Sequence, residues 1–382
     1  MPEKKKILVF IDWYLPGTNS GGPVRSVSNM VAHLKEDFEF SIITRDTDYC
    51  EQEPYNNINS NEWNQIDGNC NVFYISEKNI NTAYLKKLIE STYFDLAYIN
   101  GIYSRYFSIA SLRILNKLEK PVVVAARGML NPQAFSVKPF KKKVFTGTAR
   151  LLGLYKNVVF HATNEQEKEF IKQSFPNSKD ILVAPNLPRF QNQEILQLKE
   201  KNQVTRFVSV ARVAREKGTL TALKALFEIG TSAQVVYDIF GPVYDKNYWN
   251  ECKDVINKLP SNIVVNYMGS IESDKVPEIL KEYHFFLMPS EGENFGHGIL
   301  EAFTSGCPVI ISDNTPWRGL EEKKFGWDIS LSNPEEITGA INMAIEMKQE
   351  DYNLWSQNAW EFSREVINDP KVLEANKRLF RI

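Results

Sequence analysis

Apolar side chains recur along the chain in short unbroken runs, not in alternation with polar ones. "KILVFI", "VVVAA" and "PVIIS" are typical examples, and each is rich in β-branched residues. Runs of this kind indicate strands that are buried on both faces of a parallel sheet. We therefore expect strands at residues 6–11, 40–45, 96–100, 122–126, 157–162, 180–185, 206–211, 234–240, 262–268, 285–290 and 308–312.

Patterns of helical length lie between these runs. In "REKGTLTALKALFEIG" the apolar residues Leu220, Leu223 and Leu226 fall on one side of a helix, and Gly230 is placed to end it. A repeated order of strand, helix and strand predicts a doubly wound α/β fold. In such folds ligands bind at the carboxyl ends of the strands.

The length of 382 residues favours two domains over one. The stretch "APNLPRFQNQEILQLKEKNQVTR" has two prolines followed by charged residues without a strand, and each half then opens with its own strand. We expect a first Rossmann-like domain at residues 1–188 and a second at 189–361. A C-terminal helix at 362–382 is expected to join the first domain.

Composition narrows the class of protein. A net charge of −2 gives no general attraction to nucleic acid, and 43% apolar residues are typical of a globular protein. The four cysteines are scattered, which indicates reduced thiols rather than a zinc site or a disulfide framework. The basic start "MPEKKKILVFID" contains Asp12 and is expected to be a first strand, not a signal peptide. These features favour a cytoplasmic protein that meets any membrane only from its surface.

The segment "PSEGENFGHGILEAFTSGCPVIIS" carries the strongest chemical signal. It predicts a strand, a turn and a short helix, with Glu293 in the turn, Glu301 in the helix and seven residues between them. A turn of this kind aims backbone N–H groups and the positive end of the helix dipole away from the sheet, which suits a diphosphate. The two carboxylates can accept hydrogen bonds from sugar hydroxyls. The alternative is that Glu293 is a solvated loop residue and Glu301 a solvent-facing helix residue.

Two further turns follow the same logic. "SVARVAREKGTL" places Arg212 and Lys217 after a buried strand and before a helix, where two cations can neutralise a diphosphate. "GGPVRS" places Gly21 and Gly22 before a helix that is expected to begin near Val24. An ordinary solvated helix start and an ordinary turn are the respective alternatives.

Taken together, these stretches resemble the retaining nucleotide-sugar glycosyltransferases of family 4, also called group 1, which have the two-lobed GT-B fold. The resemblance runs along almost the whole chain, through "GGPVRS", "VVVAARGMLNPQA", "SVARVAREKG", "IFGP", "NYMGSI" and the segment with the two glutamates. It implies two Rossmann-like lobes that face a cleft. It also implies that Glu293 holds the donor sugar, that Glu301 holds the ribose, and that Arg212 and Lys217 hold the diphosphate. The remaining residues that it places near the donor are Gly241, Gly269, Asn294, Phe295, Gly296 and His297.

"ARGMLNPQA" and "DNTPWRGL" further resemble a branch of this family from bacterial surface-polysaccharide pathways. Many relatives have a histidine where "INGIYS" has Asn100, so the contribution of that histidine is in question here. Arg127 is the first-lobe candidate for a polar group at the reacting centre; the alternative is an arginine paired with a surface carboxylate. His161 is expected to be structural or a weaker site residue.

The expected reaction is transfer of a hexose from a UDP- or GDP-linked donor to a glycan or lipid-linked oligosaccharide, with retention of anomeric configuration. No Asp-x-Asp pair is placed as a metal clamp, so we expect no metal requirement. A nucleotide-sugar epimerase of the same fold and a non-catalytic sugar-binding protein are the alternatives.

A basic segment at residues 138–156 interleaves six cations with large apolar side chains. Such a segment can lie on an anionic bilayer. We therefore expect peripheral attachment to the inner face of the plasma membrane. The alternative is a solvated cationic helix whose apolar face packs on the first lobe.

Overall fold

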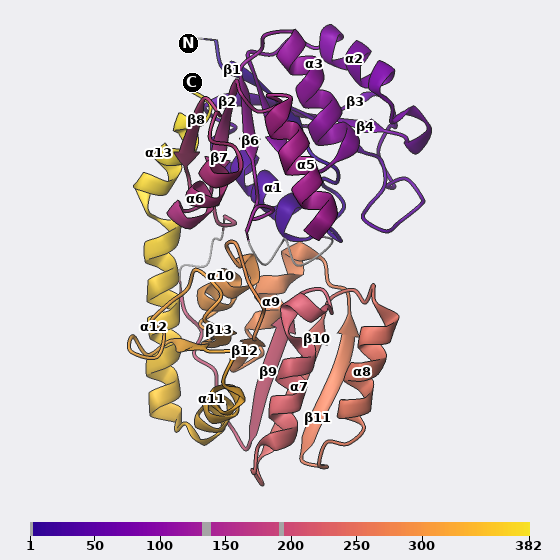
Figure 1. Cartoon of the computed structure of the whole chain (residues 1–382). Coiled ribbons are helices and arrows are strands. Elements are labelled where there is room, and N and C mark those ends of the chain that lie inside the picture. The colour runs from indigo at the N-terminus through magenta and orange to yellow at the C-terminus, as the bar shows by residue number, and fades with distance from the viewer. Residues whose placement is uncertain (1–2, 132–138, 191–194) are drawn as a thin grey trace. The chain divides into compact units, whose positions relative to one another are not determined.

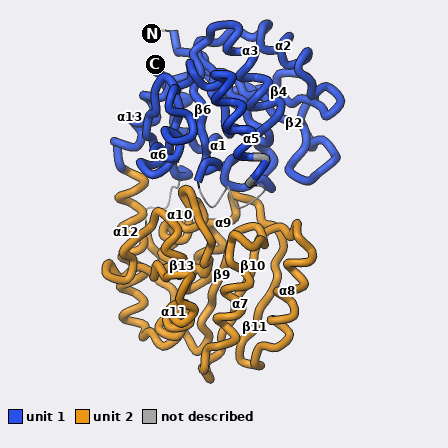
Figure 2. Tube along the Cα trace, in the orientation of Figure 1, with its two compact units in different colours: residues 1–190, 369–382 blue, residues 191–368 orange. Residues whose placement is uncertain are grey.

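The structure is a computed structural model that describes residues 3–131, 139–190 and 195–382. The chain forms two compact units, one of residues 1–190 and 369–382 and one of residues 191–368 (Figure 2). The first boundary was expected after residue 188 and lies after residue 190. The chain returns to unit 1 at Asp369, not at residue 362.

The described part of unit 1 contains a sheet of eight strands in the order β3-β4-β2-β1-β5-β6-β7-β8 (Figure 1). All neighbouring strands are parallel except β3 and β4, which form an antiparallel pair. The strands are β1 (Lys5–Phe10), β2 (Phe38–Arg45), β3 (Trp63–Asp67), β4 (Cys70–Ile75), β5 (Leu96–Asn100), β6 (Val122–Ala125), β7 (Val158–Ala162) and β8 (Asp180–Val183).

Helices cover both faces of this sheet, because successive strand residues point to opposite faces and both sets are apolar. Leu8 and Phe10 belong to the core that packs against α2, α3, α5 and α6, whereas Ile7 and Val9 belong to the core beside α1 and the C-terminal segment. The helices are α1 (Gly22–Leu34), α2 (Thr82–Ser91), α3 (Ser111–Lys117), α5 (Pro139–Leu151), α6 (Glu165–Ser174) and α13 (Pro370–Arg378), with shorter helical turns η1 (Glu77–Asn79) and η2 (Arg105–Ala110).

The described part of unit 2 contains an all-parallel sheet of six strands in the order β11-β10-β9-β12-β13-β14. This is the doubly wound order of a Rossmann fold, and it reverses direction between β9 and β12. The strands are β9 (Val204–Val210), β10 (Gln234–Phe240), β11 (Ile263–Gly269), β12 (Phe285–Met288), β13 (Val309–Ser312) and β14 (Gly326–Ile329).

Unit 2 also has a core on each face of its sheet. Phe285 and Leu287 face the core formed with α7, α8 and α11, and Phe286 and Met288 face the core formed with α9, α10 and α12. The helices are α7 (Thr219–Glu228), α8 (Lys246–Ile256), α9 (Val276–Leu280), α10 (His297–Thr304), α11 (Pro334–Glu346) and α12 (Gln349–Ile367), with shorter turns η3 (Arg215–Lys217) and η4 (Ser273–Lys275).

The expected doubly wound α/β fold is confirmed, and each of the eleven expected runs overlaps an observed strand. Three strands were missed. β3 is a polar, largely exposed strand at the sheet edge, so its side chains carry no burial pattern. β4 and β14 are largely buried, but each is short. They were missed because the expected alternation of strands and helices was already complete without them.

The later return of the chain to unit 1 has a physical cause in α12. The ring of Phe362 stacks on Phe325 with centroids 4.6 Å apart and meets the edges of Phe303 and Trp317, all in unit 2. The helix therefore continues in unit 2 to Ile367, and the chain changes unit at Asp369, which caps α13. No helix in the described ranges has the length and apolar character needed to cross a membrane.

Candidate active site

The sequence-predicted residues of unit 2 gather where the strand order reverses. Arg212 follows β9, and Glu293 follows β12, which is its neighbour in the sheet. Strand ends at such a reversal point diverge into helices on opposite faces and leave a crevice between their loops. The two turns that were picked out separately in the sequence are thus side by side.

The turn after β9 is built for close approach to β12. Gly218 begins α7 with φ of 72°, a left-handed conformation that side chains other than glycine rarely adopt. A Cβ atom at this position would lie 2.0 Å from the carbonyl oxygen of Pro289. The backbone N–H of Glu291 donates to the carbonyl of Glu216 at 2.9 Å. This packing holds the two turns together.

Lys217 and Glu293 form an ion pair across the two turns. The Nζ of Lys217 lies 2.5 Å from Oε1 of Glu293, and their side chains are only 20% and 11% exposed. Their partial burial makes this pair less screened by solvent than a surface pair. The loop of Glu293 is held by its backbone N–H, which donates to the carbonyl of Asn314 at 3.2 Å. The alternative of a solvated loop residue is therefore wrong for Glu293.

Arg212 is the more accessible cation of this site. Its guanidinium lies 3.3 Å from Oε1 of Glu216, in a pair whose side chains are 36% and 50% exposed. An exposed pair of this kind contributes little stability, so its arginine can change partner at low cost. The site therefore has one cation in a partly buried ion pair, Lys217, and one cation in an exposed ion pair, Arg212.

The turn after β12 is held by aromatic residues. Gly296 begins α10 with φ of 77° and without a side-chain cap. The indole Nε1 of Trp317 donates to the carbonyl of Phe295 at 2.7 Å. The Phe295 ring also lies 4.8 Å from the His297 ring and 5.6 Å from the Trp317 ring. These contacts fix the direction in which the first turn of α10 leaves the sheet.

Glu301 lies one turn further along α10 and is buried, with 6% of its surface exposed. The alternative of a solvent-facing helix residue is therefore wrong. A carboxylate is costly to bury unless it has partners, so its presence in an otherwise apolar helix indicates a specific role. Asn294 lies in the same turn as Glu293 and is half-buried.

Gly241 and Gly269 end the neighbouring strands β10 and β11. The N–H of Gly241 donates to the carbonyl of Gly269 at 2.8 Å. A Cβ atom on Gly241 would lie 1.9 Å from the carbonyl oxygen of Ala211, so this glycine lets β10 pass close to the residue before Arg212. Both glycines lie at the carboxyl edge of the sheet, and Gly241 shapes the turn that carries Arg212.

Unit 1 gathers polar residues at the carboxyl ends of four adjacent strands, centred on Arg127. Its Nε donates to Oδ1 of Asn100 at 2.7 Å, one terminal nitrogen donates to the Tyr98 hydroxyl at 2.8 Å, and the other donates to Oδ1 of Asn186. All three partners are neutral, and no carboxylate within the described residues forms an ion pair with this arginine. The alternative of pairing with a surface carboxylate is therefore wrong.

His161 supports this arrangement as a neutral ring. Burial, together with the charge of Arg127, lowers the pKa of His161 to about 3. Its Nε2 lies 2.7 Å from the carbonyl of Ala184, which can only accept, so Nε2 carries the proton. Nδ1 then accepts from the Tyr98 hydroxyl at 2.8 Å. The donors run in one direction, from Arg127 through Tyr98 and His161 to the backbone.

A buried carboxylate fixes the loop of Arg127. Glu167 is 1% exposed and accepts from the N–H of Gly128 at 2.5 Å and from both the N–H and the hydroxyl of Thr163 at 2.7 Å. Arg127 itself has φ of 53°, which its neighbours must hold in place. Sequence reasoning missed Tyr98, Asn186 and Glu167. Tyr98 and Asn186 could have been found as polar residues within or next to an apolar run, whereas Glu167 lies in the charged stretch "NEQEKE", which gave no such signal.

Gly21 and Gly22 lie at the start of α1, with φ of 73° at Gly21. A Cβ atom at either position would meet nothing within 4 Å. The N–H groups of Thr18 and Asn19 in the preceding loop already donate to Asp48, at 2.9 and 3.1 Å. This turn therefore has open space at the two glycines. The two backbone N–H groups before it are already used in hydrogen bonds that hold the loop.

Among the described residues, no group of three or more His, Cys, Asp or Glu side chains is arranged to hold a metal ion. Asp46 and Asp48 form an Asp-x-Asp pair in the sequence, and both have structural partners. Asp46 accepts from the hydroxyl of Ser60 at 2.7 Å, and Asp48 holds the loop before α1.

The model of the family "Glycosyl transferases group 1" matches residues 190–362. Unit 2 is thus similar to the group 1 glycosyltransferases. The match covers nearly all of this unit and includes both turns of the candidate site. Over 163 residues the chain is 28% identical to the sulfoquinovosyl transferase SQD2 of Arabidopsis thaliana. That alignment covers 40% of this chain and 29% of the relative.

Two solved structures have the same fold as the whole chain. The crystal structure of HepE from Anabaena in complex with UDP and glucose superposes with a TM-score of 0.71 at 16% identity, and covers 98% of each chain. WaaG, a glycosyltransferase involved in lipopolysaccharide biosynthesis, superposes with a TM-score of 0.68 at 12% identity and the same coverage. Together with the two sheets, one parallel throughout and one parallel except for its β3–β4 pair, these likenesses confirm the expected GT-B type of architecture.

Proposed function

We propose that the protein is a retaining hexosyltransferase. It would move a sugar from a nucleotide-sugar donor to a glycan or lipid-linked oligosaccharide in the biosynthesis of a bacterial surface polysaccharide such as O-antigen, capsule or exopolysaccharide. The observation that supports this function most directly is the Lys217–Glu293 ion pair at the reversal point of the unit 2 sheet, within the segment that matches group 1 glycosyltransferases.

The proposed donor site uses the charges of the two turns. Arg212 and Lys217, with the N-terminal ends of α7 and α10, would stabilise the negative charge that grows on the departing diphosphate. Glu293 would accept hydrogen bonds from the donor sugar, and Glu301 from the ribose. The turn residues Asn294, Phe295, Gly296 and His297, with Gly241 and Gly269, would shape the surroundings of the nucleotide sugar.

Donor binding would rearrange the ion pair. When a diphosphate reaches Lys217, it competes for the ammonium group that Glu293 holds. The released carboxylate is then available to sugar hydroxyls next to the diphosphate. A single exchange of partners would thus couple recognition of the diphosphate to recognition of the sugar.

The proposed chemistry breaks the bond between the anomeric carbon and the diphosphate oxygen. The acceptor hydroxyl forms the new glycosidic bond on the same face of the sugar, and its proton passes to an oxygen of the departing phosphate. No side chain then has to act as a strong base. Arg127 is proposed as the polar group of the acceptor-side unit, because its guanidinium donates to neutral partners and not to a carboxylate.

Two comparisons support the substrate classes. The HepE structure contains UDP and glucose, which favours a UDP-linked donor here, with a GDP-linked donor as the other candidate. WaaG acts in lipopolysaccharide biosynthesis, which favours a polysaccharide acceptor. The donor reaction is further proposed to need no metal ion, because cationic side chains can provide the charge.

The test incubates the protein with UDP-, GDP- and ADP-sugars, with and without a mixture of lipid-linked and soluble oligosaccharides, and measures released nucleotide and product. Release that depends on the acceptor, with a product whose anomeric configuration matches the donor by NMR, is the expected result. Conversion of the donor sugar without an acceptor would indicate an epimerase, and binding without turnover a sugar-binding protein. Activity that disappears in EDTA and returns with magnesium would contradict the metal-free proposal.

A further inference from the structure

Helix α5 of unit 1 has an apolar face that no part of the described chain covers. Phe140, Leu151 and Leu152 are 79%, 86% and 70% exposed, and Val144 is 48% exposed. Isolated exposed apolar residues are ordinary on protein surfaces, but four in one short segment are not. This segment therefore presents an unusual surface.

The exposed residues form a single row along α5. Phe140, Val144, Gly147 and Leu151 follow one another at intervals of four, three and four residues, which places them on one side of the helix. The opposite side fixes the helix to unit 1. Ala149 is 4% exposed, and the Phe145 ring packs edge to face on Tyr103 with centroids 5.3 Å apart. The row consequently points away from the core.

The charges beside this row are all positive. Lys143, Arg150 and Lys156 are exposed, and residues 138–164 contain no aspartate or glutamate. None of these three cations has a carboxylate within 4.0 Å in the part of the chain that the structure describes. Lys142 differs, because its Nζ lies 5.5 Å from the centre of the Tyr103 ring and burial lowers its pKa. Lys138, which was counted in the basic segment, lies outside the described residues.

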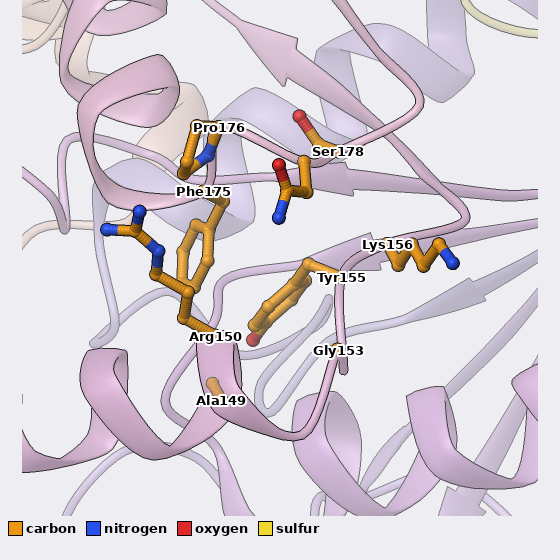
Figure 3. A pocket seen from close by; sticks show the side chains of 9 residues that line it. Ala149, Arg150, Gly153, Tyr155, Lys156, Phe175, Pro176 and Ser178 are labelled. Carbon is orange, nitrogen blue, oxygen red and sulfur yellow. The ribbon is translucent and has the colours of Figure 1, made fainter.

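A small cavity of about 50 Å³ opens beside the C-terminal end of α5. Figure 3 shows Arg150 and Lys156 on opposite sides of it, with the rings of Tyr155 and Phe175 between them. The cations at this end of the helix thus surround an aromatic hollow and do not point at one another, which leaves each of them available to a separate anionic group.

We infer that this outer face of α5, continued by Leu152 and Lys156, docks on the surface of an anionic lipid bilayer. Phe140, Val144, Leu151 and Leu152 would enter the boundary between headgroups and acyl chains, and the three cations would contact lipid phosphates. A bilayer fits better than a protein partner because it offers apolar depth and negative charge along the whole row. Docking of this kind goes beyond the proposed sugar transfer and does not depend on it.

The test is co-sedimentation of the full chain with vesicles of phosphatidylcholine alone or with phosphatidylglycerol at about three to one. Sedimentation only with the anionic vesicles, and release by high salt, is the expected result. Each cation is expected to contribute about fivefold to the partition coefficient. A Lys143→Glu, Arg150→Glu, Lys156→Glu variant should therefore lose at least a hundredfold, and a Phe140→Ser, Leu151→Ser, Leu152→Ser variant should also stay in the supernatant.

Unit 2 provides matched controls. Lys246→Glu, Lys253→Glu, Lys258→Glu makes the same change of charge at exposed lysines, and Phe227→Ser, Met343→Ser, Leu354→Ser removes exposed apolar side chains. Both should sediment as the wild type does. A wild-type protein that stays in the supernatant at low salt, or α5 variants that sediment unchanged, would overturn the proposal. A dimer that the α5 variants abolish, without vesicle binding, would assign the face to a second copy instead. No donor or acceptor is present, so failure here leaves the proposed transfer reaction untouched.

Discussion

At the scale of single residues, Lys217 and Glu293 have opposite expected roles toward a donor and yet form an ion pair with each other. In the proposed donor site the carboxylate of Glu293 would oppose a diphosphate, because it would add negative charge beside the phosphate and it holds the cation that would neutralise it. Glu301 is instead buried within α10, whereas Glu293 pairs with Lys217 in the turn before it. The two glutamates should therefore respond differently to substitution.

We predict that Glu293→Gln leaves the affinity for UDP or GDP unchanged or tightens it, while lowering kcat by roughly tenfold to a hundredfold. Glu301→Gln should weaken nucleotide binding by a similar factor, because losing a charged hydrogen-bond partner costs about 1.5–3 kcal/mol. Titration calorimetry with the bare nucleotides, combined with steady-state kinetics, measures both effects. Equal nucleotide affinities in the two variants would contradict the assignment.

A second residue-scale prediction concerns Tyr98, whose hydroxyl accepts from Arg127 and donates to His161. Tyr98→Phe keeps the ring but leaves two buried polar groups without a partner. We expect a loss of about 1–3 kcal/mol in the free energy of unfolding. We also expect a severalfold rise in KM for the acceptor, because Arg127 loses one of the three hydrogen bonds that orient its guanidinium.

Tyr155→Phe is the matched control, since Tyr155 is also buried and its hydroxyl donates to the carbonyl of Ile102 at 3.2 Å. It should lower stability without changing KM. If Tyr98→Phe behaves in the same way, Tyr98 is structural only and does not position Arg127.

At the scale of elements, the site depends on how closely the β9–α7 turn approaches the end of β12. Gly218 allows this approach because it has no Cβ and adopts positive φ. We predict that Gly218→Ala lowers the free energy of unfolding by at least about 2 kcal/mol, since it combines left-handed strain with a steric clash against backbone. It should also weaken nucleotide binding, because Lys217 is the preceding residue.

Gly230→Ala, just beyond the other end of α7, provides the comparison. A Cβ there meets nothing within 4 Å, and the residue is exposed. Thermal unfolding and UDP binding of this variant should match the wild type. A Gly218→Ala protein that is as stable as Gly230→Ala would show that the turn can relax away from Pro289.

At the scale of the whole molecule, each unit contains a buried histidine that folding keeps neutral. Burial is the main cause of the pKa of about 3 for His161 in unit 1 and of about 4 for His284 in unit 2. An unfolded chain has histidines with a pKa near 6.5 and so binds more protons than the folded chain below that pH. The stability from these two groups is complete above pH 6.5 and is lost as the pH falls toward 3 or 4.

We predict that each histidine costs roughly 2 kcal/mol of stability between pH 7 and pH 5. His161→Gln keeps a donor and an acceptor but does not titrate, so its stability should fall less than that of the wild type over this range. Urea unfolding at pH 7, 6 and 5 gives the difference between the two proteins. A wild-type advantage that stays constant with pH would mean that the pKa of His161 is the same in the folded and unfolded states.

The sequence alone determined where most strands lie and which turns carry charged residues. Buried β-branched runs identified eleven strands, because a strand covered on both faces has to be apolar throughout. The turns that carry Arg212, Lys217 and Glu293 were recognisable because each follows such a run directly. The edge strand β3 gave no signal of this kind, because its side chains are largely exposed and need not be apolar.

Only the tertiary structure decided which of these turns meet. The pairing of Lys217 with Glu293 joins residues 76 positions apart, and it exists because β9 and β12 are neighbours in the sheet. The same is true of Arg127, whose partners Asn100 and Asn186 come from other strand ends, and of α5, whose outward face depends on how Phe145 and Ala149 pack. Hydrophobic periodicity reports whether a residue is buried but not against what, because burial is a property of one position and a contact is a property of two.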